Sequence, residues 1–348
     1  MSKYFGYVGT YTNGESEGIY SFILHTDTGK ITNVTLAEQF DNPCYLSISR
    51  DQTALYTSTT VDQSGGIASF SINQSDGSLH LINMELTKGT SPCHVSVDQK
   101  NEYIVAAYYH RGCLVLNPIH NRKLQPISSV IQHEGSGPNE ERQEQPHVHF
   151  TDFTPDGQYV VAIDLGTDQL NTYSIEENKL KLVQSLSLLP GCGPRHMAFH
   201  PNGKYAYVLT ELSNEIIALS YNRNDGSFKE IQYNPSTPLD YPFNSLASAI
   251  RISSDGRFIY TANRGHNSIA VLQIDEQTGK LTLVEHVSTE GDWPRDFSLD
   301  PSEKYLIVSN QKSNNLVLFT RDLSTGKLTL LQSDIIIPEP TCVKFISK

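Results

Sequence analysis

GPRHMAFHPNGKYAYV, residues 193–208, returns as WPRDFSLDPSEKYLIV at residues 293–308. Each copy has the pattern of a turn, a short strand, a polar turn and an apolar strand. A further strand follows each copy, at 216–221 and 316–320, and after it come a glycine-containing hairpin and a fourth strand. Four strands in a repeating unit of this length indicate a β-propeller blade. Because one sheet cannot bury both of its faces alone, such units must pack around a common axis.

Weaker copies of the unit bring the count to seven. They begin at Asn42, Ser91, Gln145 and Ser245, and the N-terminal strands within 4–24 supply most of one more unit. The C-terminal run 340–345 resembles the first strand of a unit whose other strands are missing. We therefore expect an all-β, seven-bladed β-propeller with four antiparallel strands per blade, closed by the C-terminal strand joining the N-terminal blade. One such domain accounts for residues 1–348.

Glycine-containing turns recur at one place in the unit and favour strands over helices. Glycine supplies the positive φ that tight hairpins require. Each turn is followed by a run that alternates apolar and polar residues, and no long segment has the period of a helix. We therefore expect little helix. The turns are Asp27–Lys30, Ser75–Ser78, Asp225–Ser227, Gln277–Lys280 and Ser324–Lys327.

Composition limits the partners and the compartment. The net charge of −12 and the pI of about 5.4 argue against a nucleic-acid-binding surface. Five cysteines without CxxC spacing are typical of free thiols in a reducing cytosol. No apolar run approaches membrane-spanning length, and the N-terminus lacks a signal-peptide pattern. We expect a cytoplasmic protein that binds neither nucleic acid nor a membrane; the sequence carries no signal for an oligomeric state.

Overlaying the units identifies positions that face the axis of a propeller. At the start of the innermost strand, the residue type at the equivalent position differs from unit to unit. A position with a structural role would repeat the same residue, so this variation favours a ring of side chains that faces a ligand. The loop after the second strand gives another ring near the same end. The first ring consists of Cys44, Cys93, His149, Arg195, Ser248 and Arg295, and the second includes Asp164-Leu165, Thr210-Glu211, Asn263-Arg264 and Asn310-Gln311.

Together the two rings gather arginines, histidines and one carboxylate around a single mouth. Arginine binds phosphate or carboxylate through two hydrogen bonds, and histidine acts as a base near neutral pH. Each residue alone also has a structural alternative: Arg195 and Arg295 would pair with acids of the next blade, His196 would pack within its blade, and Glu211 would be a solvated loop residue. Convergence is what favours a site. His147 and His149 have metal-ligand spacing, but no third ligand is evident, so no metal is expected.

At these residues the chain resembles the seven-bladed-propeller 6-phosphogluconolactonases. The resemblance covers essentially the whole chain, and the Gly-Pro-Arg-His and Asn-Arg segments are its most specific parts. It implies hydrolysis of 6-phospho-D-glucono-1,5-lactone to 6-phosphogluconate in the pentose phosphate pathway of carbohydrate metabolism. The implied partner is a small anionic sugar lactone, and no cofactor is implied. The matching motifs are Gly9-Thr10-Tyr11, Gln145–His149, Asp164–Asp168, Gly193–Met197, Ala262–Arg264 and Trp293–Phe297.

The fold family is also similar to the fungal carboxymuconate lactonizing enzymes, in which a histidine, a glutamate and two arginines form the proposed catalytic set. By motif these fall on His149, Glu211, Arg195 and Arg264. The rings add substrate-binding residues, namely His147, His196, Arg295, Asn263 and Gln311. The chain departs from the pattern in Leu246-Ala247-Ser248, which lacks the usual proline, and in the long loop 133–145, which would restrict access.

His149 is the expected general base, with His147 as its competitor. Glu211 would orient the histidine, and Arg195 or Arg264 would stabilise the oxyanion. The absence of a G-x-S-x-G sequence disfavours an acyl-enzyme. The alternatives are a lactonizing cycloisomerase, a lactonase for another small carboxylate, or a non-catalytic propeller that binds a protein. A narrow funnel of arginine and histidine indicates an enzyme, whereas a broad apolar patch indicates a docking surface.

Overall fold

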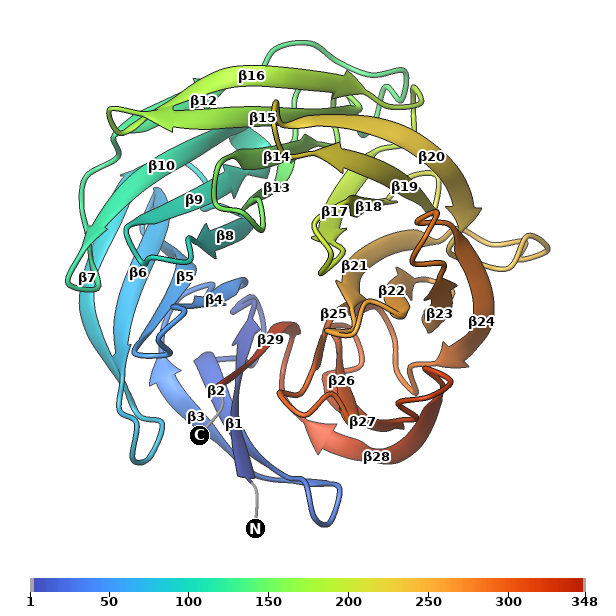
Figure 1. The fold of residues 1–348 in the computed structure, drawn as a ribbon. Coiled ribbons are helices and arrows are strands. Elements are labelled where there is room, and N and C mark those ends of the chain that lie inside the picture. Colours follow the sequence, from blue (N-terminus) through green and yellow to red (C-terminus); the bar gives the residue numbers. More distant parts are fainter. Residues whose placement is uncertain (1–2, 347–348) are drawn as a thin grey trace.

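The structure is a computed structural model that describes residues 3–346 as seven antiparallel sheets around a central axis (Figure 1). The domain expected over 1–348 thus includes two residues at each end that lie outside the described residues. The predicted seven-bladed, all-β propeller is confirmed. Within residues 3–346, no helix is long and apolar enough to cross a membrane. The helical segment η1 is a single 3-10 turn at Tyr109–Arg111.

Each blade begins with its innermost strand. From the axis outward, the first blade consists of β29 (Pro340–Ile346), β1 (Lys3–Thr10), β2 (Gly18–His25) and β3 (Lys30–Gln39). The second consists of β4 (Leu46–Ile48), β5 (Ala54–Val61), β6 (Ser64–Ile72) and β7 (Leu79–Lys88). The third consists of β8 (His94–Val97), β9 (Tyr103–Tyr108) and β10 (Cys113–His120), and both β11 (Lys123–Leu124) and β12 (Ser129–Gln132) pair with β10.

The other four blades are regular. They consist of β13 (Val148–Phe153), β14 (Val160–Asp164), β15 (Gln169–Glu176) and β16 (Lys179–Ser187); β17 (Pro194–Phe199), β18 (Tyr205–Thr210), β19 (Glu215–Asn222) and β20 (Ser227–Pro235); β21 (Leu246–Ile252), β22 (Phe258–Arg264), β23 (Ser268–Ile274) and β24 (Leu281–Ser288); and β25 (Pro294–Leu299), β26 (Tyr305–Asn310), β27 (Asn315–Arg321) and β28 (Leu328–Ile336).

The C-terminal strand closes the ring, as predicted. β29 pairs antiparallel with β1, with Gly6 opposite Phe345 and Val8 opposite Val343. Figure 1 shows β29 in red against β1 in blue, so that one blade is made from both ends of the chain. Without β29 the inner edge of β1 would expose unpaired backbone groups.

The blades pack face to face through apolar side chains, and the second strands are largely buried on both faces, as in residues 160–163 of β14. A recurring hydrogen bond joins neighbouring blades: the tyrosine of a second strand donates to the glycine carbonyl of the next blade's outer hairpin. Tyr207 Oη donates to Gly279 O at 3.0 Å, and Tyr260 Oη donates to Gly326 O at 2.8 Å. A Cβ on Gly279, whose φ is +71°, would lie 2.6 Å from the Tyr205 ring. The hairpin glycines are therefore needed for two reasons: they adopt the positive φ of the turn, and they leave room for the side chains of the neighbouring blade.

Candidate active site

Irregularities at the start of the innermost strands aim side chains at the axis. The pairing of β17 with β18 skips Arg195, that of β13 with β14 skips His149, and that of β25 with β26 skips Arg295. A bulged residue leaves the alternation of the strand and re-aims its side chain. In β21, where the proline is missing, the irregularity extends over Ser248 and Ala249. Four of the six ring positions found by overlaying the units are thus bulged positions. The other two, Cys44 and Cys93, lie just before β4 and β8.

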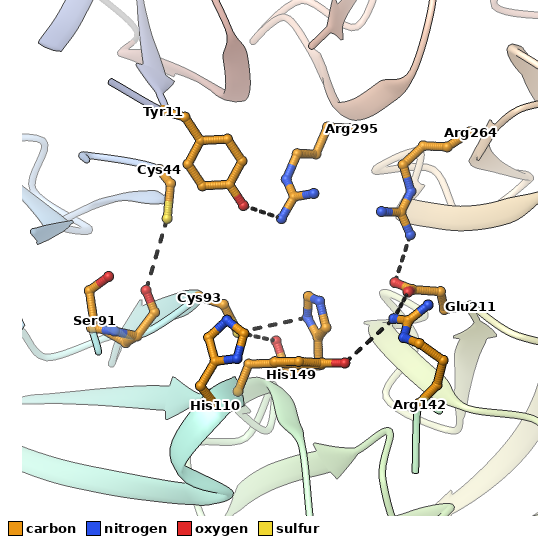
Figure 2. A pocket seen from close by; sticks show the side chains of 12 residues that line it. Tyr11, Cys44, Ser91, Cys93, His110, Arg142, His149, Glu211, Arg264 and Arg295 are labelled. Carbon is orange, nitrogen blue, oxygen red and sulfur yellow. Dashed lines mark hydrogen bonds and ion pairs between the residues drawn. The ribbon is translucent and has the colours of Figure 1, made fainter. Parts of the chain in front are cut away.

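One end of the axis holds a cavity of about 250 Å³ (Figure 2). Its charged side chains are three arginines and one glutamate, which gives a charge of 3 − 1 = +2 on the wall of a protein whose net charge is −12. Such a wall attracts small anions. The lining residues are Tyr11, Cys44, Ser91, Pro92, Cys93, Tyr109, His110, Arg142, His149, Glu211, Arg264 and Arg295.

Glu211 is the centre of a buried ion-pair cluster. Its Oε2 accepts hydrogen bonds from Arg195 Nε at 2.9 Å and from Arg264 Nη2 at 2.6 Å. Its Oε1 accepts one from Arg142 Nη2 at 2.5 Å. The side chains of Glu211, Arg195 and Arg264 are all at least nine-tenths buried. One carboxylate thus fixes three guanidinium groups, which come from the long loop before β13, the start of β17 and the end of β22.

The cluster keeps its members charged. Burial alone would raise the pKa of Glu211, but Arg264 and Arg195 hold that pKa well below its usual value. Burial and then repulsion from Arg264 lower the pKa of Arg195 to about 9, which leaves it protonated at neutral pH. Arg195 also donates to the carbonyl of Ser248 in the next blade. A fixed, water-poor set of positive groups of this kind stabilises developing negative charge.

His149 lies across the cavity from Arg264 (Figure 2). It is 6% exposed, and its Nδ1 is 3.9 Å from Cys93 Sγ. Burial, and after it the charge of Arg195, lowers the pKa of His149 well below 6.5. The imidazole is therefore neutral at pH 7 and able to accept a proton. Glu211 forms its hydrogen bonds with arginines and not with His149, so it orients the cations rather than the histidine.

Arg295 occupies another part of the wall. Its Nη2 donates to Tyr11 Oη at 2.6 Å, and its guanidinium lies 5.0 Å from the centre of the Tyr11 ring. No carboxylate of the described chain forms an ion pair with Arg295, so its charge is available to a ligand. Arg264 packs against the Trp293 ring at 5.4 Å. Tyr11 thus orients the guanidinium group of Arg295, and Trp293 that of Arg264.

Five predicted site residues lie off the cavity wall, namely the predicted catalytic residue Arg195 and four predicted binding residues. Both ring nitrogens of His147 face acceptors, Tyr109 O and Glu144 Oε1, each at 3.1 Å, so both are engaged away from the cavity. Asn263 exchanges hydrogen bonds with Ser236 behind the wall. The wall also leaves out His196, which accepts a hydrogen bond from Arg195 at 3.2 Å deeper on the axis, and Gln311.

Eight of the twelve wall residues were not among the predicted site residues, and they include Arg142, Tyr11 and Tyr109. Arg142 belongs to the long loop 133–145, which the sequence predicts to restrict access. Tyr11 and Tyr109 directly follow β1 and β9, the position that Glu211 and Arg264 occupy at the ends of β18 and β22. Extending the second ring to these two blades would have found both tyrosines.

The long loop is tied down beside the cavity rather than projecting from it. His133 Nδ1 lies 2.7 Å from Asp164 Oδ2, and the buried Gln143 donates to Leu165 O at 2.8 Å. These anchors place Arg142 against Glu211 and 3.4 Å from Tyr109 Oη. Arg142 is the most exposed member of the cluster, with 33% of its side chain accessible, so it forms the rim. Within the described chain, no group of three or more His, Cys, Asp and Glu residues is placed to hold a metal ion.

Comparison with known proteins places this geometry in a family. The profile of the family described as "Lactonase, 7-bladed beta-propeller" matches residues 5–345. The chain is 50% identical over 347 residues to a 6-phosphogluconolactonase of Bacillus subtilis, covering 99% of both proteins. It is 40% identical over 337 residues to an uncharacterized protein of Lactococcus lactis, covering 97% of both.

Solved structures show the same architecture. A protein of Lactobacillus plantarum superposes with a TM-score of 0.95 at 39% identity, covering 99% of this chain and 100% of that one. A periplasmic gluconolactonase of Pseudomonas aeruginosa superposes with a TM-score of 0.94 at 29% identity, covering 99% of each.

Proposed function

The chain belongs to the seven-bladed β-propeller lactonase family, and from this we propose that it is a 6-phosphogluconolactonase. It hydrolyses 6-phospho-D-glucono-1,5-lactone to 6-phosphogluconate, a step of the pentose phosphate pathway. The full-length similarity to the Bacillus subtilis enzyme supports this substrate. The observation that supports it best in the structure is the cluster of Glu211 with three arginines beside a neutral, buried His149.

The charge of the cavity suits this substrate. A phosphorylated lactone presents a phosphate of about two negative charges and a carbonyl that becomes negative during attack. Arg295, which has no carboxylate partner among residues 3–346, and Arg142 at the rim are the proposed phosphate ligands. Arg264 and Arg195, which Glu211 holds in place, are the proposed stabilisers of the oxyanion.

The proposed reaction uses one base and no covalent intermediate. His149 takes a proton from a water molecule, and the resulting hydroxide attacks the lactone carbonyl carbon. The carbonyl oxygen becomes an alkoxide next to the guanidinium of Arg264 or Arg195. As the tetrahedral intermediate collapses, the bond between carbonyl carbon and ring oxygen breaks, and the ring oxygen takes the proton back from His149. The product is a carboxylic acid, which loses its proton at neutral pH.

We further propose a cytoplasmic location, in keeping with a pathway of sugar phosphates. All five cysteines are free thiols, three of them buried, as in proteins of a reducing compartment. The acidic net charge is in keeping with a partner that is a small molecule rather than nucleic acid.

A coupled assay tests the function. Glucose-6-phosphate dehydrogenase forms the phosphorylated lactone in place, and its decay is compared with the spontaneous rate. We expect micromolar protein to accelerate the decay and the His149→Gln variant to lose most of that effect. Glucono-1,5-lactone is assayed in parallel, because a gluconolactonase is among the related structures. Faster hydrolysis of that unphosphorylated lactone, or no acceleration of either, would overturn the proposed substrate.

A further inference from the structure

The axis holds a second cavity, on the far side of the molecule from the first. The innermost strands begin at the active-site end, where Arg195 and His149 lie, and run along the axis to the other end. There the later residues of these strands, such as Asp152 of β13, Arg251 of β21 and Lys344 of β29, line a cavity of about 370 Å³. It shares no lining residue with the active-site cavity.

A stack of aromatic rings separates the two cavities. The rings of Tyr45 and His94 are 4.1 Å apart, those of His94 and Phe150 are 4.4 Å apart, and those of His94 and His196 are 5.3 Å apart. His196 in turn contacts Arg195 of the active site. The second cavity is therefore a separate compartment, with His94 in its floor.

The wall of the second cavity contains a cation without an acidic partner. Lys344 forms no ion pair with any carboxylate of residues 3–346, and its ammonium lies 5.0 Å from the centre of the Tyr45 ring. Its neighbour Arg251 uses Nη2 to bind Asp296 Oδ1 at 2.7 Å and Nη1 to bind the carbonyl of Ile250. About a quarter of the Arg251 side chain remains accessible from the cavity.

Two polar groups complete the wall. His94 is 2% exposed, and neither of its ring nitrogens has a hydrogen-bond partner in the described chain. Neither nitrogen is accessible from the cavity, so the ring forms the floor and offers no hydrogen bond to a ligand. Asp152 accepts a hydrogen bond from the backbone N–H of Phe153 at 2.8 Å, and burial raises its pKa to about 6. Burial, with the charges of Lys344 and Arg251, holds the pKa of His94 well below 6.5, so this ring is neutral.

We propose that this second cavity binds a small hydroxylated anion of the sugar phosphate class, with its anionic group on Lys344 and Arg251 and its hydroxyls on Asp152. Two cations beside one another favour a phosphate or carboxylate group. The carboxylate of Asp152 opposes a bare anion but accepts hydrogen bonds from hydroxyls. The volume is within the range of small-molecule sites. This site is distinct from the active site and does not depend on the proposed function.

Calorimetric titration with glucose 6-phosphate and with inorganic phosphate tests the proposal. We expect Lys344→Met to weaken glucose 6-phosphate binding about tenfold or more, since a charge-assisted hydrogen bond contributes on the order of 1.5–3 kcal/mol. The matched control is Lys280→Met, which removes a fully exposed lysine from an outer hairpin and should bind as the wild type does. Both variants should keep the wild-type lactonase activity. Equal affinity in Lys344→Met and wild type would overturn the proposal.

A third variant distinguishes binding at the active site from binding in the second cavity. Arg264→Ala removes a cation from the first cavity and should leave the affinity of the second cavity unchanged. If the glucose 6-phosphate signal disappears in Arg264→Ala and persists in Lys344→Met, the ligand belongs to the active site and the second site is disproved. Failure of the lactonase assay alone would disprove the proposed function and leave these titrations unaffected.

Asp152→Asn provides an isosteric second test, which also decides the question if Lys344→Met fails to fold. Removing this negative charge should tighten inorganic phosphate binding several-fold and reduce the preference for glucose 6-phosphate over phosphate. Unchanged affinities for both ligands would contradict a role for Asp152. Binding of an amino acid such as alanine in preference to glucose 6-phosphate would overturn the sugar phosphate class.

Discussion

At the scale of single residues, position and hydrogen-bond partners decide which histidine can act as a base, because both rings are buried. His149 is neutral and lines the cavity, whereas both nitrogens of His147 are engaged by Tyr109 and Glu144. The two side chains are two positions apart in the sequence but have different partners. Bulging at His149 turns its ring to the axis, while His147 stacks on Tyr109 at 4.2 Å.

The two histidines should therefore respond differently to the same substitution. We expect His149→Gln to lower the turnover rate by about 10²–10⁴-fold, the usual contribution of a general base. His147→Gln is the matched control, and its turnover should stay within a few-fold of the wild type. Steady-state kinetics of both variants, with circular dichroism to confirm folding, make the comparison. A larger loss of turnover in His147→Gln than in His149→Gln would make His147 the general base.

Arg264 is the arginine of the cavity wall that we expect to contribute most to catalysis. It binds Glu211 and also donates from Nε to the carbonyl of Leu246 at 3.0 Å. Truncating a buried, hydrogen-bonded charge costs about 2–5 kcal/mol. Arg264→Ala should therefore lower kcat/KM by two orders of magnitude or more, with the far-ultraviolet spectrum unchanged. Wild-type kinetics in this variant would remove Arg264 from the mechanism.

At the scale of elements, β29 carries the closure of the whole ring. It pairs with β1 and buries the side chains of Cys342, Val343 and Ile346. It also connects to the next blade, because Thr341 Oγ1 donates to Cys44 O at 2.9 Å. Both the sheet edge and the packing between blades thus depend on this one strand.

Deleting residues 340–348 should destabilise the protein strongly. Three buried apolar side chains lost at about 1.5–3 kcal/mol each amount to several kcal/mol. In a chain of this size we expect the Tm to fall by about 10 °C or more, and the exposed edge of β1 to promote aggregation. Differential scanning calorimetry and light scattering measure the two effects. A truncated protein that remains monomeric with the Tm of the full chain would show that β29 is dispensable for closure.

At the scale of the whole molecule, buried titratable groups along the axis link stability to pH. His94, His149 and His196 all have pKa values well below 6.5, chiefly through burial. In the unfolded chain they titrate near 6.5, so below that pH the unfolded state binds protons that the folded state does not. Glu211, whose pKa is depressed, adds stability above its unfolded pKa, and this is lost as the pH falls through its folded pKa.

The histidines and Glu211 act in one direction, whereas Asp152, with its pKa raised to about 6, takes up a proton first in the folded state and acts in the other. Because three histidines outweigh one carboxyl group, the free energy of unfolding should decrease as the pH falls from about 7 to about 5. Urea denaturation at several pH values measures the slope. Replacing His94 by Gln should make the slope shallower, because one group that titrates only in the unfolded state is removed. A free energy of unfolding that is constant or rises over this interval would contradict the assigned protonation states.

The sequence by itself determined the propeller, the number of blades and the closing strand, because these follow from local patterns. Strand alternation, hairpin glycines and the spacing of the repeats are properties of neighbouring residues. The overlay of the repeats also located His149, Arg195 and Arg295, because a bulge occupies the same place in these three blades.

Only the tertiary structure decided how these residues are paired. Glu211 binds Arg142, Arg195 and Arg264, which lie 69, 16 and 53 positions away in the chain, and Arg295 binds Tyr11 at a separation of 284. Such partners meet because the blades converge on one axis, and no spacing in the sequence encodes which side chains then touch. For the same reason the second cavity, whose wall comes from β4, β8, β13, β17, β21 and β29, could be recognised only in the folded molecule.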